Sequence, residues 1–77
     1  MKRVVSLAKL KAGDKAQVLG ISSGGGLERK LMNMGIYKGK EVAKLSHIGL
    51  RGPVVIKVGR TILALGHGIA EKVQVEV

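Results

Sequence analysis

The chain contains no cysteine, a single proline and a single aromatic residue, Tyr37, among its 77 residues. Without cysteine it can form neither a disulfide nor a thiolate metal site, so a domain this small must be stabilised by aliphatic packing. Hydrophobic residues make up 45% of the sequence. No apolar run approaches the roughly 18 residues that a membrane-spanning helix needs, and the start of the chain lacks the pattern of a signal peptide. These absences predict one cytoplasmic domain over residues 1–77.

Acidic residues are also scarce, because 14 lysines and arginines outnumber 5 aspartates and glutamates and give a net charge of +9. Such an excess favours an acidic partner surface, nucleic acid or anionic lipid as the partner. The basic residues are scattered, however, and a lone tyrosine provides no platform on which bases of single-stranded nucleic acid could stack. Nucleic acid is therefore not the expected partner, although salt-sensitive binding to the phosphate backbone remains an alternative.

Twelve glycines divide the chain into short segments, a pattern typical of a small barrel or sandwich. The sequence predicts one helical turn at residues 6–12 and a short helix in which Leu27, Leu31 and Met34 share a face, ending in a left-handed cap at Gly35. A flexible loop is expected at residues 22–26 and another at 49–52, with a further helical turn at 69–71. Strands are predicted at residues 15–21, about 40–48, 54–58, 61–65 and 72–77, with a bulge in the second and a type II′ turn at Gly59–Arg60.

The predicted fold class is therefore all-β, mainly β with a short helix, as a small antiparallel barrel of about five strands. Closing the sheet on itself would remove the exposed edges of an open array. The predicted core consists of alternating aliphatic residues from the strands and the helix stripe: Val18, Leu31, Met34, Val42, Val54, Ile56, Val73 and Val75.

The sequence shows little that could carry out catalysis or hold a cofactor. The glycine run at residues 24–26 lacks the Lys-Ser/Thr pair of a phosphate-binding loop. Ser46 and His47 are neighbours in a predicted strand, so their side chains point to opposite faces. His47 and His67 are the only plausible soft metal ligands; they are expected as separate surface residues, and two histidines do not make a closed metal site. We expect no enzyme, no cofactor and no intrachain metal site, while a site shared between subunits remains open.

Several motifs together resemble the FeoA family of bacterial and archaeal ferrous iron transport. The most specific element is Arg29-x-Leu31-x-x-Met34-Gly35-Ile36-x-x-Gly39. The others are Leu7-x-x-Leu10-x-x-Gly13-Asp14-x-Ala16-x-Val18, Gly52-Pro53-Val54-Val55-Ile56, Leu63-Ala64-Leu65-Gly66 and Ala70-x-Lys72-Val73-x-Val75. The resemblance implies an SH3-like fold, a role beside FeoB (a membrane permease with a GTPase domain) and no catalysis. The family is also associated with transition metals, and related modules occur in metal-dependent repressors.

We expect the partner to bind at the turn that follows the short helix. Ile36 and Tyr37 lie just beyond the predicted cap, where an apolar side chain can stay exposed as an anchor. The basic residues around this anchor are Arg29, Lys30, Lys38 and Lys40, which suit an acidic surface such as the FeoB GTPase region. Tyr37 is equally consistent with core packing. The alternative function is a basic SH3-like module that binds nucleic acid or acts as a metal-responsive regulatory domain, and a homo-oligomer is compatible with so small a core.

Overall fold

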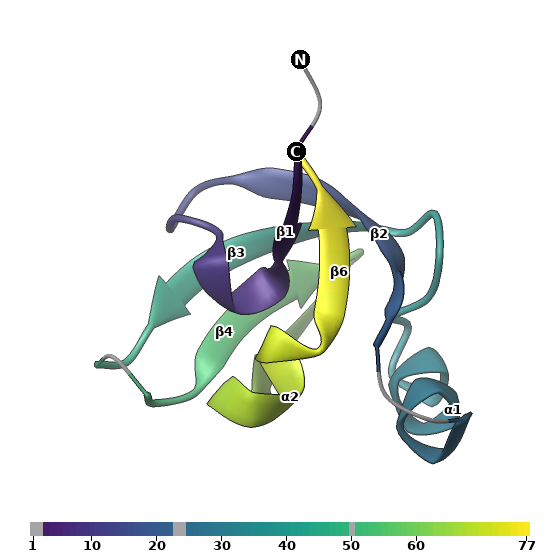
Figure 1. The fold of residues 1–77 in the computed structure, drawn as a ribbon. Coiled ribbons are helices and arrows are strands. Elements are labelled where there is room, and N and C mark those ends of the chain that lie inside the picture. The colour runs from purple at the N-terminus through teal and green to yellow at the C-terminus, as the bar shows by residue number, and fades with distance from the viewer. Residues whose placement is uncertain (1–2, 23–24, 50) are drawn as a thin grey trace.

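The computed structural model describes residues 3–22, 25–49 and 51–77, which form a strongly curved antiparallel sheet with short helices beside it (Figure 1). In chain order the elements are β1 (Val4–Ser6), the 3-10 turn η1 (Leu7–Lys9), β2 (Lys15–Ile21), α1 (Gly25–Asn33), β3 (Glu41–His47), β4 (Val54–Val58), β5 (Thr61–Leu65), α2 (His67–Glu71) and β6 (Val73–Glu76). The all-β class is confirmed. No helix among the described residues is long and apolar enough to cross a membrane.

The sheet has six strands in the order β1-β6-β2-β3-β4-β5, so the prediction of five strands missed one. The missing strand is β1, which pairs with β6 through Val5 and Val75 near the two ends of the chain. Backbone hydrogen bonds between Arg3 and Val77 extend this pairing, and Figure 1 shows β1 beside β6. Three residues give too little alternation to reveal a strand whose partner lies at the far end of the sequence.

Helix α1 ends as its sequence predicts, with Gly35 in the left-handed conformation at a φ of 91°. The N–H of Ile36 donates to the carbonyl of Leu31, and the N–H of Gly35 donates to the carbonyl of Met32. These two bonds form a Schellman motif, in which the residue after the glycine packs back onto the last turn of the helix. Leu31 and Ile36 are accordingly both buried.

The predicted turn and bulge are both present. Gly59 has a φ of 61° and Arg60 is not in the positive-φ region, which fits a type II′ turn between the paired residues Val58 and Thr61. In β3 the register against β4 shifts between Lys44 and Ser46, so Leu45 is the extra, bulged residue. The expected loops fall partly on residues 23, 24 and 50, which lie outside the described residues.

The core lies inside the curve of the sheet and matches the prediction except at Met34, which is only half-buried against it. The predicted core residues Val18, Leu31, Val42, Val54, Ile56, Val73 and Val75 are all buried. The additional buried side chains are Leu7, Ala8, Leu10, Ala16, Ile36, Val58, Leu65, Ala70 and, unexpectedly, Lys44.

Candidate functional site

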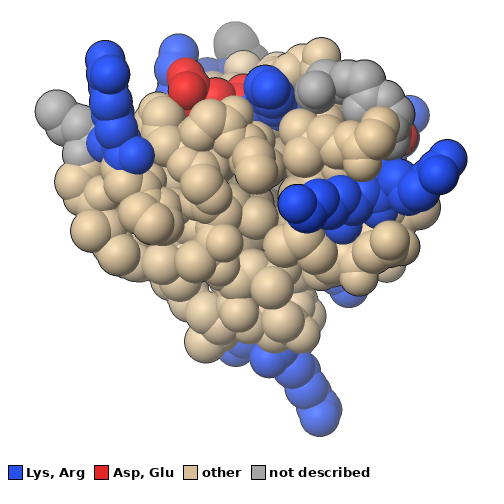
Figure 2. Space-filling model, turned by 90° about the horizontal axis from the view of Figure 1, so that it is seen from below, with Lys and Arg blue, Asp and Glu red and all other residues tan. Residues whose placement is uncertain are grey.

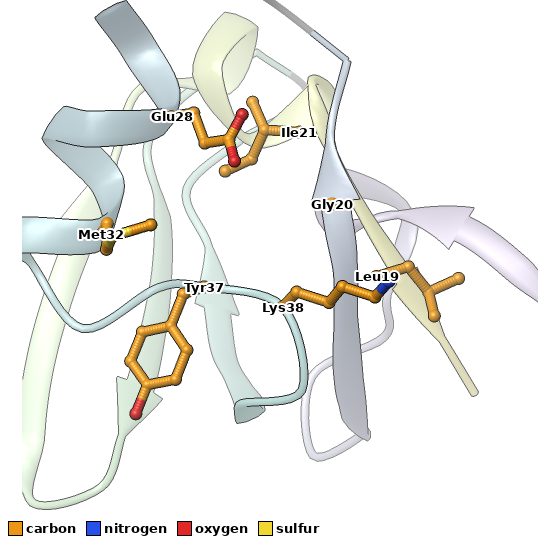
Figure 3. A pocket seen from close by; sticks show the side chains of 7 residues that line it. All are labelled: Leu19, Gly20, Ile21, Glu28, Met32, Tyr37 and Lys38. Carbon is orange, nitrogen blue, oxygen red and sulfur yellow. The ribbon is translucent and has the colours of Figure 1, made fainter. Parts of the chain in front are cut away.

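A largely apolar pocket of about 490 Å³ opens between α1, β2 and the turn that follows α1 (Figure 3). Its lining residues are Leu19, Gly20, Ile21, Glu28, Met32, Tyr37 and Lys38. Four of the side chains, those of Glu28, Met32, Tyr37 and Lys38, are exposed, so the pocket is open to a partner.

Local backbone structure positions the side chains in each wall of the pocket. Glu28 and Met32 are four residues apart and therefore project from the same side of α1. A register shift between Val18 and Gly20 in β2 bulges Leu19 out of the regular alternation. Lys38 lies inside a tight turn, in which the N–H of Lys40 donates to the carbonyl of Tyr37 and Gly39 has a φ of 92°.

The predicted docking residues are only partly gathered at this pocket. Tyr37, which is 43% exposed, and Lys38 line it. Arg29 and Lys30 are exposed on α1 but do not line the pocket. Lys40 is half-buried and lines a different hollow, together with Lys15 and Lys57.

The expectation that Ile36 is an exposed anchor is wrong, because its side chain is fully buried. Its place in the Schellman motif explains the burial, since that position packs against the helix instead of facing solvent. The apolar surface near Tyr37 is instead supplied by Met32, Leu19 and Ile21. Alternation across the bulge in β2 does not reveal Leu19, whereas the spacing of Met32 from Glu28 on α1 could have been read from the sequence.

Basic side chains project from the edges of the face seen in Figure 2, while uncharged atoms fill its centre. This distribution agrees with the scatter of lysine and arginine along the sequence.

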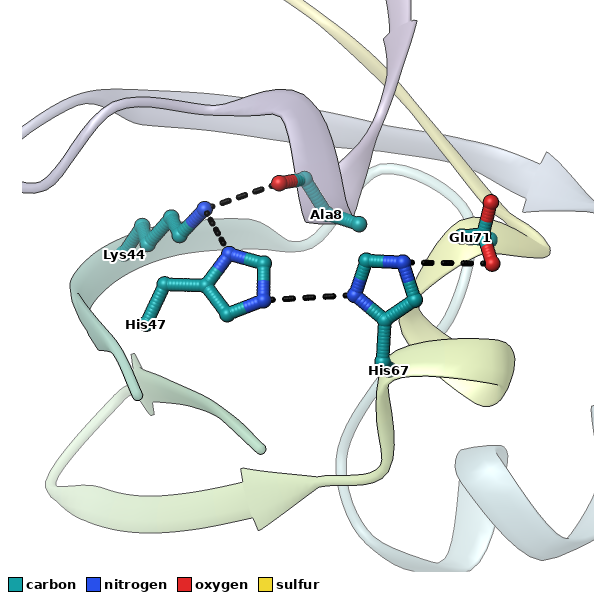
Figure 4. Close-up of polar contacts among 5 residues, drawn as sticks. All are labelled: Ala8, Lys44, His47, His67 and Glu71. Carbon is teal, nitrogen blue, oxygen red and sulfur yellow. Dashed lines mark hydrogen bonds and ion pairs between the residues drawn. The ribbon is translucent and has the colours of Figure 1, made fainter. Parts of the chain in front are cut away.

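A second feature of the structure is a polar network that the sequence did not predict (Figure 4). The two histidines, expected as separate surface residues, are stacked with ring centroids 5.2 Å apart and with His47 Nε2 3.2 Å from His67 Nδ1. His67 Nε2 lies 3.3 Å from Glu71 Oε1, one helical turn further along α2. His47 Nδ1 lies 3.2 Å from Lys44 Nζ. The network therefore joins β3 to α2.

Lys44 is the buried end of this network, with 3% of its surface exposed. Its ammonium donates to the carbonyl oxygens of Ala8, at 2.8 Å, and Leu10. Burial lowers the pKa of the Lys44 ammonium below its usual value. A buried lysine without a carboxylate partner is costly, so its polar contacts must compensate for lost hydration.

The fold is a small, strongly curved antiparallel sheet of six strands that carries an apolar pocket at its surface. No three histidine or acidic groups gather as a metal site within residues 3–22, 25–49 and 51–77. The model of the FeoA domain matches residues 5–77, and the chain belongs to the FeoA family.

Individual relatives agree with this assignment. A curated relative from Methanocaldococcus jannaschii, described as putative Fe(2+) transport protein A, is 34% identical over 70 residues, which cover 91% of this chain and 83% of the relative. A crystal structure described as the iron uptake regulatory protein FeoA superposes with a TM-score of 0.87 at 34% identity, covering 97% of this chain and 99% of that one. The structure of Stenotrophomonas maltophilia FeoA, described as a zinc complex and an SH3 domain protein, superposes with a TM-score of 0.80 at 25% identity, covering 95% of each chain.

We expect the isolated monomer to have no high-affinity site for Fe²⁺ or Zn²⁺. The two facing histidine nitrogens supply too few ligands for a closed site, and the Lys44 ammonium beside His47 would repel a second cation. Calorimetric titration with each metal, under anaerobic conditions for Fe²⁺, should show no stoichiometric submicromolar binding. Such binding, abolished by His47→Ala or His67→Ala, would contradict this expectation.

Proposed function

We propose that this protein is a cytoplasmic accessory protein of ferrous iron transport that docks onto the GTPase region of a FeoB-like permease. The observation that carries the proposal is the FeoA-domain match over residues 5–77. The curated relative is described as an Fe(2+) transport protein, and the description of the S. maltophilia structure suggests a ferrous iron transport activating factor. Neither description includes an enzymatic activity.

The pocket between α1 and β2 is the surface we propose for docking. It is apolar along Leu19, Ile21 and Met32, which suits the insertion of an apolar side chain from the partner. Tyr37 stands at its edge, and aromatic residues are enriched among the residues that dominate binding energy. Lys38 lies on the same turn and contributes to the net charge of +9, which favours an acidic partner surface.

A contact of this kind is expected to be small and reversible. Transient regulatory interfaces often bury about 1,200 Å² or less in total, and a few central residues supply most of their affinity. Charges at the rim chiefly accelerate the encounter of the two proteins, and their effect weakens as salt is added. Pocket variants should therefore change the dissociation rate, and rim variants the association rate.

Replacing Tyr37 with alanine is expected to weaken binding to the soluble GTPase region by about 1–2 kcal/mol or more, because the anchor at the edge of the pocket is lost. Met32→Ala should act in the same direction, since Met32 lines the same pocket and is 52% exposed. The affinities are measured by interferometry, with native circular dichroism confirmed for each variant. Unchanged affinity in both variants would exclude this pocket as the docking surface.

Reversing the charge of Lys38 with Lys38→Glu is expected to slow association more than it accelerates dissociation, because a rim charge acts before contact. Lys11→Glu is the matched control, since Lys11 is exposed and lines a hollow beside Arg3 and Asp14. Equal slowing by both variants would show that net charge, not this surface, attracts the partner. No binding to the complete permease in membranes would exclude the partner itself.

A further inference from the structure

We propose that Lys44, His47, His67 and Glu71 form a one-directional hydrogen-bond chain that joins η1, β3 and α2 only while both histidines are neutral. This hydrogen-bond chain holds α2 against β3 and η1, and it breaks in acid. It lies apart from the proposed docking pocket, because none of its four residues lines that pocket.

The direction of the chain is set at Lys44. An ammonium group carries three protons and no lone pair, so it can donate hydrogen bonds but cannot accept one. Two of these protons are directed at the carbonyl oxygens of Ala8 and Leu10, which can only accept. The third contact is His47 Nδ1, at 3.2 Å, so this ring nitrogen accepts and carries no proton.

The rest of the chain follows from that assignment. A neutral His47 with an unprotonated Nδ1 carries its proton on Nε2, which faces His67 Nδ1 at 3.2 Å and donates to it. His67 then carries its own proton on Nε2, which lies 3.3 Å from Glu71 Oε1 and donates to that carboxylate. Every contact in Figure 4 thus has one donor and one acceptor when both rings are neutral.

The two histidine rings cannot bind one more proton and keep every contact of the hydrogen-bond chain while Lys44 remains charged. A proton added to His67 Nδ1 would face the N–H of His47. Moving the proton of His47 to Nδ1 would place it against the Lys44 ammonium. Because each arrangement opposes two donors, protonation of the pair must break at least one contact of the chain.

The charged groups that act directly on the two histidine rings belong to the hydrogen-bond chain itself. The other charged side chains on the elements packed around it are Lys9 on η1, Glu41 on β3, Lys57 on β4 and Glu76 on β6, with Lys72 directly after α2. Lys9, Glu41, Lys57 and Lys72 are exposed to solvent, and Glu76 is half-buried. Lys44 and Glu71 are the two that contact the rings, one at each end.

The consequence for the fold is a loss of stability in acid. A proton added to either ring of the folded pair breaks a contact of the hydrogen-bond chain, whereas in the unfolded polypeptide there is no such contact to break. We therefore expect unfolding to become easier as the pH falls through the range in which free histidine titrates, about pH 5–8. Local opening should begin at α2, where His67 and Glu71 are 25% and 59% exposed.

The test combines NMR of the histidine rings with denaturation of the 77-residue protein at two pH values. Long-range ¹H–¹⁵N spectra at neutral pH should show the proton of each ring on Nε2 and none on Nδ1. The unfolding equilibrium constant of the wild type should rise at least about fivefold between roughly pH 7.5 and pH 5.5. A neutral ring protonated on Nδ1 would overturn the proposal.

Two variants separate this chain from ordinary acid destabilisation. Lys44→Met removes the donor that blocks His47 Nδ1, so its unfolding constant should change less than about twofold over the same pH interval. If that variant does not fold, His47→Gln serves instead, because its amide offers an acceptor as well as a donor, so a proton added to His67 Nδ1 no longer faces a fixed N–H. The proposal fails if the variant that is measured retains the pH dependence of the wild type.

Discussion

Replacing Ile36 with alanine is expected to lower the free energy of unfolding by about 2–5 kcal/mol, the range found for large aliphatic residues truncated in a packed core. Ile36 is fully buried, and its N–H bonds to the carbonyl of Leu31 at the end of α1. Truncation therefore leaves a cavity between the helix and the sheet. For a domain of 77 residues this is a large part of the total stability. Urea denaturation followed by circular dichroism measures the change.

Tyr37→Ala is the matched control for this prediction, because it removes a larger side chain from the adjacent position. Tyr37 is 43% exposed, so its loss should cost no more than about 1 kcal/mol of stability. Equal destabilisation by the two variants would show that the turn after α1 packs differently from the structure described here.

Ile36 also shows where sequence reasoning was incomplete. The helix, its glycine cap and the apolar stripe through Leu31 were all predicted, because they depend on local spacing and on the conformation that only glycine adopts easily. The burial of Ile36 depends on the same cap, since the residue after the glycine of a Schellman motif packs on the helix. An apolar residue directly after Gly35 is therefore a signal for burial, which the expectation of an exposed Ile36 overlooks.

The sequence predicts the strands that are bounded by turns, but it does not predict β1, which forms by pairing with a distant segment. The hairpin of β4 and β5 follows from Gly59–Arg60 and regular alternation, and the structure confirms both of its strands. By contrast, β1 exists because Val4–Ser6 pairs with β6 at the opposite end of the chain. A segment of three residues carries no periodicity that would reveal this partner.

The polar network was missed although the bulge that creates it was predicted. Residues three apart in a regular strand point to opposite faces. The extra residue Leu45 shifts the alternation, so Lys44 and His47 lie on the same side of β3 and Leu45 is left 42% exposed. The sequence indicates that a bulge is present but not at which residue, and a bulge outside the segment between Lys44 and His47 would leave these two side chains on opposite faces.

Replacing Lys44 with methionine is expected to lower the free energy of unfolding at neutral pH by about 1–3 kcal/mol. The variant keeps most of the apolar stem but leaves the carbonyls of Ala8 and Leu10 without this donor, and an unsatisfied buried acceptor costs on the order of 1–3 kcal/mol. Removing a buried charge offsets part of that loss. Lys57→Met, the same change at an exposed position on β4, should alter stability by less than about 0.5 kcal/mol.

The difference between the wild type and Lys44→Met should also grow in mild alkali. Burial lowers the pKa of Lys44 in the folded protein, so in alkali the unfolded chain holds more protons at this residue. The cost of burying the ammonium is present below the folded pKa and is relieved as the pH rises through it, which stabilises the wild type. The variant has no such group, so denaturation of both proteins at neutral pH and at about pH 9.5 isolates the effect of Lys44. A constant or shrinking difference would contradict the burial of a charged Lys44.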